Sequence, residues 1–104
     1  TEDLAGELTK AMDELKDCEG IIIFTDLMGG TPFNTAAQLG RDKENVRILA
    51  GTNLPMLVEV VMSRKFMDDL DGLVDSLLQT GKEQVAKFEI KKAEQTEPED
   101  EDGI

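Results

Sequence analysis

The hydrophobic and polar positions of the chain follow first a helical pattern and then a strand pattern. Apolar residues recur at helical spacing over residues 2–16, which predicts an amphipathic helix with Thr1 or Asp3 as its cap. A short apolar run over 21–25 predicts a first strand, and residues 46–50, which are apolar except for Arg47, predict a second. The first run has no polar alternation, which is typical of a strand buried on both faces in a parallel sheet.

Each predicted strand is followed by the signals that start a helix. After the first strand, Thr31 suits the N-cap position, Pro32 the first helical position and Gly40 the end of the helix. After the second strand, Pro55 opens a helix that is predicted to end near residue 65.

The rest of the chain predicts one more helix, an edge strand and a tail. The helix covers residues 68–80, and Gly81 is expected to end it. Residues 82–92 alternate apolar and charged side chains, which favours a half-exposed edge strand. Residues 93–104 are rich in acidic side chains and are expected to form a disordered tail.

The order of these elements predicts an α/β protein. We expect a mostly parallel sheet covered by helices on both faces, with a C-terminal antiparallel edge strand. One domain would cover residues 1–92, followed by the acidic tail over 93–104. The fully apolar strand over 21–25 needs neighbours on both edges, so we expect the first elements of the fold to lie upstream of Thr1.

The composition of the chain excludes several kinds of partner, metal site and catalytic group. The formal net charge is -12, which argues against nucleic acid as a partner. The chain contains no histidine, which excludes histidine-based metal sites and the usual general base, and its carboxylates lack the spacing of a calcium loop. The single cysteine, Cys18, is interpreted as a packing residue because no histidine can activate it. We expect neither a metal nor an organic cofactor.

Ligands of open parallel sheets bind beyond the carboxyl ends of the strands, where two loops of this chain are predicted. In the first loop, Gly29 and Gly30 allow close backbone approach, and the helix that opens at Thr31 offers free N–H groups to an anion. Asp26 would repel a phosphate unless a histidine lay between them. The same residues also fit a plain turn with a helix cap.

The second loop, Gly51 to Met56, gives a weaker signal. Asn53 and Pro55 suit a turn followed by a helix start, so a structural role is the simpler interpretation.

Two segments of the chain resemble a known family. Residues 21–34, which contain Thr-Asp-Leu-Met-Gly-Gly-Thr-Pro, resemble the strand-and-loop signature of mannose-family EIIA domains of the bacterial sugar phosphotransferase system. Residues 51–57 resemble the second signature of these domains, and the spacing between the two segments matches. The resemblance extends over residues 1–91 and leaves out the acidic tail.

The resemblance implies a cytoplasmic phosphoryl carrier. Such a domain accepts a phosphoryl group on a histidine from HPr and passes it to EIIB, and it meets the membrane components EIIC and EIID only indirectly, at the inner face of the membrane. It is usually a homodimer that exchanges a C-terminal antiparallel strand, which would be the stretch from Val85 to Ile90. Neither a cofactor nor nucleic acid is implied.

The resemblance also assigns roles to residues of both loops. Asp26 would orient the acceptor histidine, and Thr31 with the backbone of Gly29 and Gly30 would bind the phosphoryl group. The rim of the site would comprise Leu27, Met28, Asn53, Leu54, Pro55 and Met56.

The chain departs from the family pattern because it begins at what resembles the second helix. The opening strand, helix and strand, which carry the acceptor histidine in the family, are absent from the 104 residues. We therefore expect the chain to be part of a longer carrier. The alternative is a non-catalytic, EIIA-like regulatory or interaction module. A receiver that is phosphorylated directly on Asp26 is disfavoured, because no further carboxylate adjoins Asp26 to hold Mg²⁺.

Overall fold

The computed structural model describes residues 2–90 of the chain. Its elements follow the predicted order and are α1 (Glu2–Glu14), β1 (Ile21–Phe24), α2 (Thr31–Gly40), β2 (Val46–Leu49), α3 (Leu54–Ser63) and α4 (Leu70–Glu83). The α/β class is confirmed. The proposed capping of the first helix by Thr1 lies outside the described residues, whereas Asp3 lies inside α1 and is not its cap.

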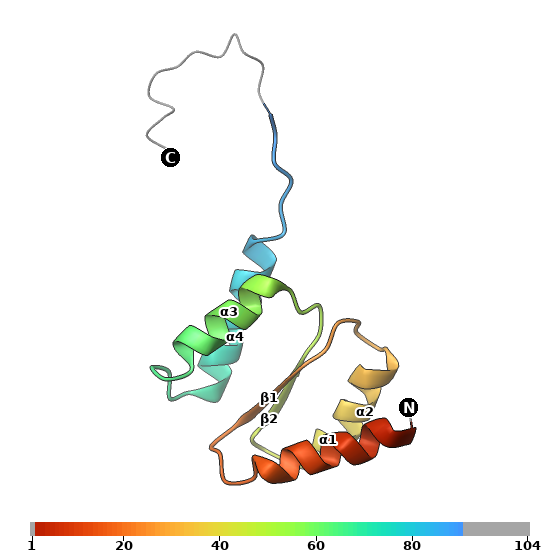
Figure 1. Ribbon diagram of the computed structural model, residues 1–104. Helices are drawn as coiled ribbons and strands as arrows, with labels where there is room; N and C mark the ends of the chain where they lie inside the picture. Colours follow the sequence, from red (N-terminus) through yellow and green to blue (C-terminus); the bar gives the residue numbers. More distant parts are fainter. Residues whose placement is uncertain (1, 91–104) are drawn as a thin grey trace.

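The two strands form a parallel sheet in which Ile21 pairs with Val46 and Phe24 with Leu49. Helix α2 is the connection between them, as parallel strands require. The pairs α1–α2 and α3–α4 lie on opposite sides of the sheet (Figure 1). The prediction of a parallel sheet with helices on both faces is therefore confirmed.

The apolar strand residues divide between two cores because successive side chains of a strand point to opposite faces. On the α1–α2 side, Ile21 and Val46 pack with Met12 of α1. On the α3–α4 side, the buried residues are Leu49, Met56, Leu73 and Leu77. A continuous apolar run was thus the correct sign of a strand that faces helices on both sides.

Helices α2 and α3 start in different ways. The N-cap of α2 is Gly30, which has no side chain to accept a hydrogen bond, and Thr31 is already helical. The prediction that Thr31 is the cap was therefore wrong by one position. In α3 the Asn53 side chain caps the helix by accepting a hydrogen bond from the backbone N–H of Met56 at 3.4 Å.

Gly40 and Gly81 serve close packing. A Cβ atom at Gly40 would lie 2.9 Å from Cγ1 of Val46, so the absence of a side chain lets α2 approach β2. Gly81 was predicted to end the last helix, but α4 starts at Leu70, after the N-cap Asp69, and continues through Gly81 to Glu83. This prediction was wrong because Gly81 is a buried helical residue.

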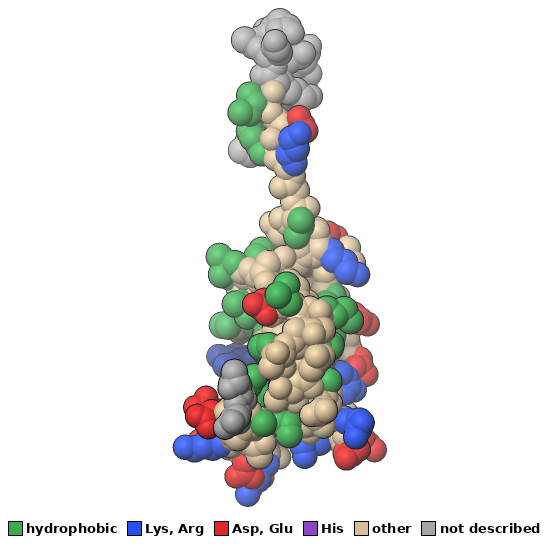
Figure 2. All heavy atoms as spheres, turned by 90° about the vertical axis from the view of Figure 1, so that its right-hand side faces the viewer, with side chains coloured by type: hydrophobic (Ala, Val, Ile, Leu, Met, Phe, Trp, Pro, Cys, Tyr) green, Lys and Arg blue, Asp and Glu red, His purple; other side chains and the backbone are tan. Residues whose placement is uncertain are grey.

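The predicted C-terminal edge strand is not formed within the described residues, and its last two positions, 91 and 92, lie outside them. Residues 82 and 83 belong to α4, and residues 85–90 are paired with no strand in the described part of the chain. The reason is geometric, because α4 carries the segment away from the sheet (Figure 1). Figure 2 shows that the segment stands clear of the body, with hydrophobic side chains on one side and charged ones on the other. The predicted tail over 93–104 lies outside the described residues.

Within the described residues, the structure has no helix that is both long enough and apolar enough to cross a membrane.

Candidate functional site

The two loops singled out in the sequence lie together at the carboxyl edge of the sheet. The parallel register pairs Phe24 with Leu49, so both strands end at the same level. The loop after β1 runs to the start of α2 at Thr31, and the loop after β2 runs to the start of α3 at Leu54. Both loops therefore open toward the same side of the molecule.

Hydrogen bonds lock the two loops to each other. The backbone N–H and the hydroxyl of Thr52 both donate to the carbonyl oxygen of Thr25, at 3.1 and 2.6 Å. The N–H of Gly51 donates to the carbonyl oxygen of Asp26 at 2.8 Å. The second loop thus holds the backbone of the first loop in place at the position of Asp26.

Thr25 anchors this arrangement to the sheet. Its N–H and its hydroxyl both donate to the carbonyl oxygen of Leu49, at 2.7 and 2.9 Å, and the residue is buried. The sequence analysis did not identify Thr25 or Thr52 as residues that shape the site. The available signal was a hydroxyl residue at the end of the first apolar run and another near the start of the second loop, where backbone groups need partners.

The first loop turns sharply between β1 and α2. Gly29 has a φ of +83°, a left-handed conformation that a residue with a side chain rarely adopts. The N–H of Gly30 donates to the carbonyl oxygen of Leu27 at 3.1 Å, and the side-chain amide of Asn34 donates to the carbonyl oxygen of Gly29 at 3.0 Å. Asn34 therefore ties α2 back to the loop, a role that the sequence analysis did not identify.

The start of α2 presents polar groups to solvent. The first N–H groups of a helix have no acceptor within the helix, and the positive end of the helix dipole lies there. The N-cap Gly30 supplies no side chain to cover them, and Thr31 is exposed. Asp26 is also exposed, and one of its carboxylate oxygens accepts a hydrogen bond from the N–H of Leu27 at 2.7 Å. This edge can accept an anion at the helix and a proton donor at the carboxylate.

The proposed rim residues occupy different environments. Leu27, Met28 and Leu54 are 68%, 79% and 70% exposed and flank the open edge. Both polar atoms of the Asn53 side chain form hydrogen bonds. Its oxygen caps α3, and its amide nitrogen donates to the carbonyl oxygen of Gly81 at 3.0 Å. Its structural interpretation is therefore supported.

Met56 does not lie on the rim. Its side chain is 2% exposed and packs in the core between α3 and α4, so it supports the second loop from below. Pro55 is half-buried within the first turn of α3.

No group of three or more metal-ligating side chains lies within the part of the chain that the structure describes.

Comparison with known proteins identifies the family. A family model described as "PTS system fructose IIA component" matches residues 1–78, a span that contains both loops. The chain belongs to the mannose-family EIIA components of the phosphotransferase system.

Relatives of this EIIA chain support the assignment over most of its length. It is 35% identical over 97 residues to the "PTS system mannose-specific EIIAB component" of Escherichia coli (strain K12), an alignment that covers 93% of this chain and 30% of the relative. The chain thus spans less than a third of the length of that relative.

Solved EIIA structures share the fold. The phosphotransferase system component EIIA of Streptococcus agalactiae superimposes with a TM-score of 0.73 at 35% identity, over 84% of this chain and 66% of that chain. The mannose/sorbose-specific IIA subunit of Enterococcus faecalis gives a TM-score of 0.78 at 26% identity, over 88% of this chain and 67% of that chain.

Proposed function

We propose that this EIIA chain supplies the phosphoryl-binding loops of a carrier that takes a phosphoryl group from HPr and passes it to EIIB during sugar uptake. The observation that carries the proposal is the exposed start of α2 beside Asp26, in a loop held by hydrogen bonds from Gly51 and Thr52. A phosphoryl site needs anion-binding groups in a fixed position, and backbone N–H groups at a helix start provide them.

The roles of the loop residues follow from their chemistry. Asp26 accepts the N–H of an imidazole ring, which fixes the tautomer and leaves the other ring nitrogen free to take the phosphoryl group. The phosphoryl oxygens then meet the hydroxyl of Thr31 and the backbone of Gly29 and Gly30. The 104 residues contain no histidine, so in this proposal the acceptor histidine comes from outside them.

The exposed side chains of Leu27, Met28 and Leu54 form an apolar rim around this edge, and we assign them to the docking of HPr and EIIB. Asn53 and Pro55 shape the second loop, and Met56 supports it from the core.

The carrier is proposed to work in the cytoplasm, next to the inner face of the membrane, where EIIB links it to EIIC and EIID. Its folded domain would cover residues 1–92, with the acidic tail over 93–104 outside it. The proposed homodimer exchanges residues 85–90 as an antiparallel strand. Phe88 and Ile90 are each 84% exposed in the single chain, which supports burial of this segment against a second copy.

A non-catalytic, EIIA-like regulatory or interaction module is the second candidate, because the exposed side chains of Leu27, Met28 and Leu54 would serve a protein-binding surface equally well without phosphate. A module of this kind would bind its partner proteins without any transfer of phosphate.

The decisive experiment supplies the two loops with an acceptor histidine. The chain is joined to the opening strand–helix–strand segment of a family member, which carries the acceptor histidine, and is incubated with phosphoenolpyruvate, enzyme I and HPr. Intact mass spectrometry is expected to show a phosphoryl adduct on the fusion and none on the 104-residue chain.

Variants of the fusion test the assigned residues. Asp26→Asn and Thr31→Val are each expected to slow phosphoryl transfer about 10-fold to 100-fold, since each removes one positioned polar group. Asn34→Ala, which affects the loop only through the carbonyl of Gly29, is expected to slow it less. A folded fusion that takes no phosphate would favour the module. An adduct on the chain alone would place the acceptor on another residue.

A further inference from the structure

A hollow of about 460 Å³ lies on the α1–α2 side of the sheet. No residue of the two loops lines it. Ile21, the first residue of β1, and Asn45, which directly precedes β2, both line it. The hollow is therefore at the amino edge of the sheet, opposite the carboxyl edge that carries the loops. Its volume falls within the range of about 300–1,000 Å³ that is typical of small-molecule sites.

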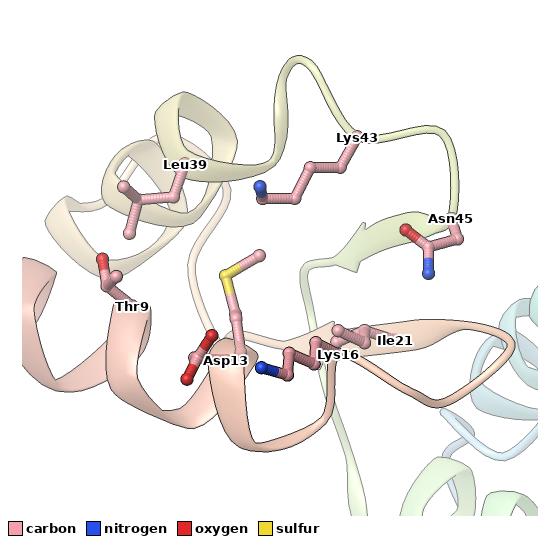
Figure 3. A pocket seen from close by; sticks show the side chains of 8 residues that line it. Thr9, Asp13, Lys16, Ile21, Leu39, Lys43 and Asn45 are labelled. Atoms are coloured by element: carbon pink, nitrogen blue, oxygen red, sulfur yellow. The ribbon is translucent and has the colours of Figure 1, made fainter.

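The hollow has an apolar floor and a polar rim. Met12 and Ile21 are 7% and 8% exposed, and the half-buried Leu39 of α2 lies beside them. Polar side chains reach in from α1 and from the two turns next to the strands, as Figure 3 shows. They belong to Thr9, Asp13, Lys16, Lys43 and Asn45.

Two of these side chains are lysines that come from different segments. Lys16 follows α1, and Lys43 lies in the turn between α2 and β2. The ion pairs found in residues 2–90 are Arg47–Asp71 and Lys87–Glu89, so neither Lys16 nor Lys43 has a carboxylate within 4.0 Å in that part of the chain. Two free ammonium groups thus meet one hollow in a chain whose net charge is -12.

Asp13 limits which anion can enter. Its carboxylate lies on the same rim, beside Lys16 (Figure 3). One carboxylate neutralises the excess positive charge of Lys16 and Lys43 over Asp13, and a second negative charge gains no net attraction there.

We propose that this hollow binds a small organic monocarboxylate, with its carboxylate at the rim that carries Lys16 and Lys43 and its apolar tail on Met12, Ile21 and Leu39. Burial of the tail provides the driving force, and the lysines select the charged end. The floor offers no charged partner to a second carboxylate, so monocarboxylates are preferred to dicarboxylates and phosphate.

The test is an amide-detected NMR titration of the 104-residue chain with isocaproate, performed below its melting midpoint. Saturable shifts are expected at Thr9, Ile21 and Asn45. Isocaproamide has the same tail without the charge, and adipate adds a second carboxylate; both are expected to bind more weakly. Because exposed ion pairs are weak, Lys16→Gln and Lys43→Gln should each weaken isocaproate binding about threefold to fivefold.

Two further variants separate the proposed site from a general effect of charge. Lys10→Gln removes the same charge from α1 but does not line the hollow, and it is expected to leave binding unchanged. Asp13→Asn is expected to strengthen isocaproate binding and to admit adipate. The proposal is overturned if no saturable shifts appear at the hollow, if isocaproamide binds as well as isocaproate, or if Lys10→Gln weakens binding as much as Lys16→Gln.

Discussion

Gly81 on α4 packs so closely against Met56 on α3 that a Cβ atom at position 81 would lie 2.7 Å from both Cγ and Sδ of that methionine. Real Cβ atoms do not approach other atoms so closely, and the buried Met56 side chain has little room to move. The same part of α4 accepts the side-chain hydrogen bond of Asn53. The end of α4 thus sets the position of the second loop.

Gly81→Ala is therefore expected to destabilise the chain. Overpacking costs about 1–3 kcal/mol, which outweighs the gain in helix propensity of about 1 kcal/mol. Urea unfolding followed by circular dichroism measures the difference. Gly6→Ala in α1 is the matched control, because a Cβ atom there meets nothing within 4 Å, and this variant should be more stable by about 0.5–1 kcal/mol. Equal stabilisation by both substitutions would show that the packing at Gly81 is looser than described.

Thr52→Val tests the link between the two loops. The substitution keeps the shape of the side chain but removes the hydroxyl that donates to the carbonyl of Thr25. We expect a loss of about 1 kcal/mol in the free energy of unfolding. Thr52→Ser keeps the donor and should recover most of the loss. In NMR spectra, the amides of Asp26 and Leu27 should shift in the valine variant and stay near their original positions in the serine variant.

The α3–α4 pair should become less stable at acid pH. The Ser76 and Thr80 hydroxyls of α4 donate to the Glu59 carboxylate of α3, and these hydrogen bonds lower the pKa of Glu59 below its ordinary value of 4.5. A carboxylate whose pKa is lower in the folded state stabilises the fold above the unfolded pKa. This contribution is lost as the pH falls through the folded pKa. Stability should therefore drop below about pH 4.5.

Variants at this pair isolate its contribution to the acid dependence. Glu59→Gln should flatten the stability profile in acid, and Ser76→Ala with Thr80→Val should cost about 1 kcal/mol per hydroxyl near neutral pH. Some acid dependence should remain, because the hydrogen bond from Arg47 also lowers the pKa of Asp71. An unchanged acid profile in Glu59→Gln would exclude Glu59 as a source of this dependence.

Self-association should depend on the apolar side of residues 85–90. Phe88 and Ile90 are each 84% exposed, and their replacement by serine should shift the chain from a dimer toward a monomer in sedimentation velocity experiments. Replacement of Lys87 and Glu89, which pair with each other at 3.4 Å, changes the same segment without loss of apolar surface and should leave association intact. A wild-type chain that is monomeric at all concentrations would contradict the proposed exchange.

The elements that could be predicted from sequence are those specified by local signals. The short, mainly apolar segments that begin at Ile21 and Val46 indicated the two strands, and Pro32 and Pro55 lie in the first turns of α2 and α3. The glycines were harder to interpret. Gly40 and Gly81 serve close packing against distant residues, and a single sequence does not show which residues will be neighbours.

The candidate site shows the same division. The places of Asp26 at a strand tip and of Thr31 at a helix start could be predicted, because strand tips and helix starts are recognisable in sequence. The roles of Thr25, Thr52 and Asn34 depend on hydrogen bonds to backbone carbonyls, which appear only once the strands are in register. The burial of Met56 likewise follows from its contact with α4 and not from its position in a loop signature.

The bonds from Thr52 to Thr25 and from Thr25 to Leu49 have a kinetic consequence. The N–H of Thr25 bonds to the last residue of β2, and the N–H of Thr52 bonds to Thr25, so both amides are expected to exchange their hydrogens slowly with water while the sheet is intact. Slow exchange at both amides would mark the tips of the strands as part of the same cooperative unit as the sheet. The loops would then open only when the strands separate, and the edge that they form would hold its shape between one encounter with a partner and the next.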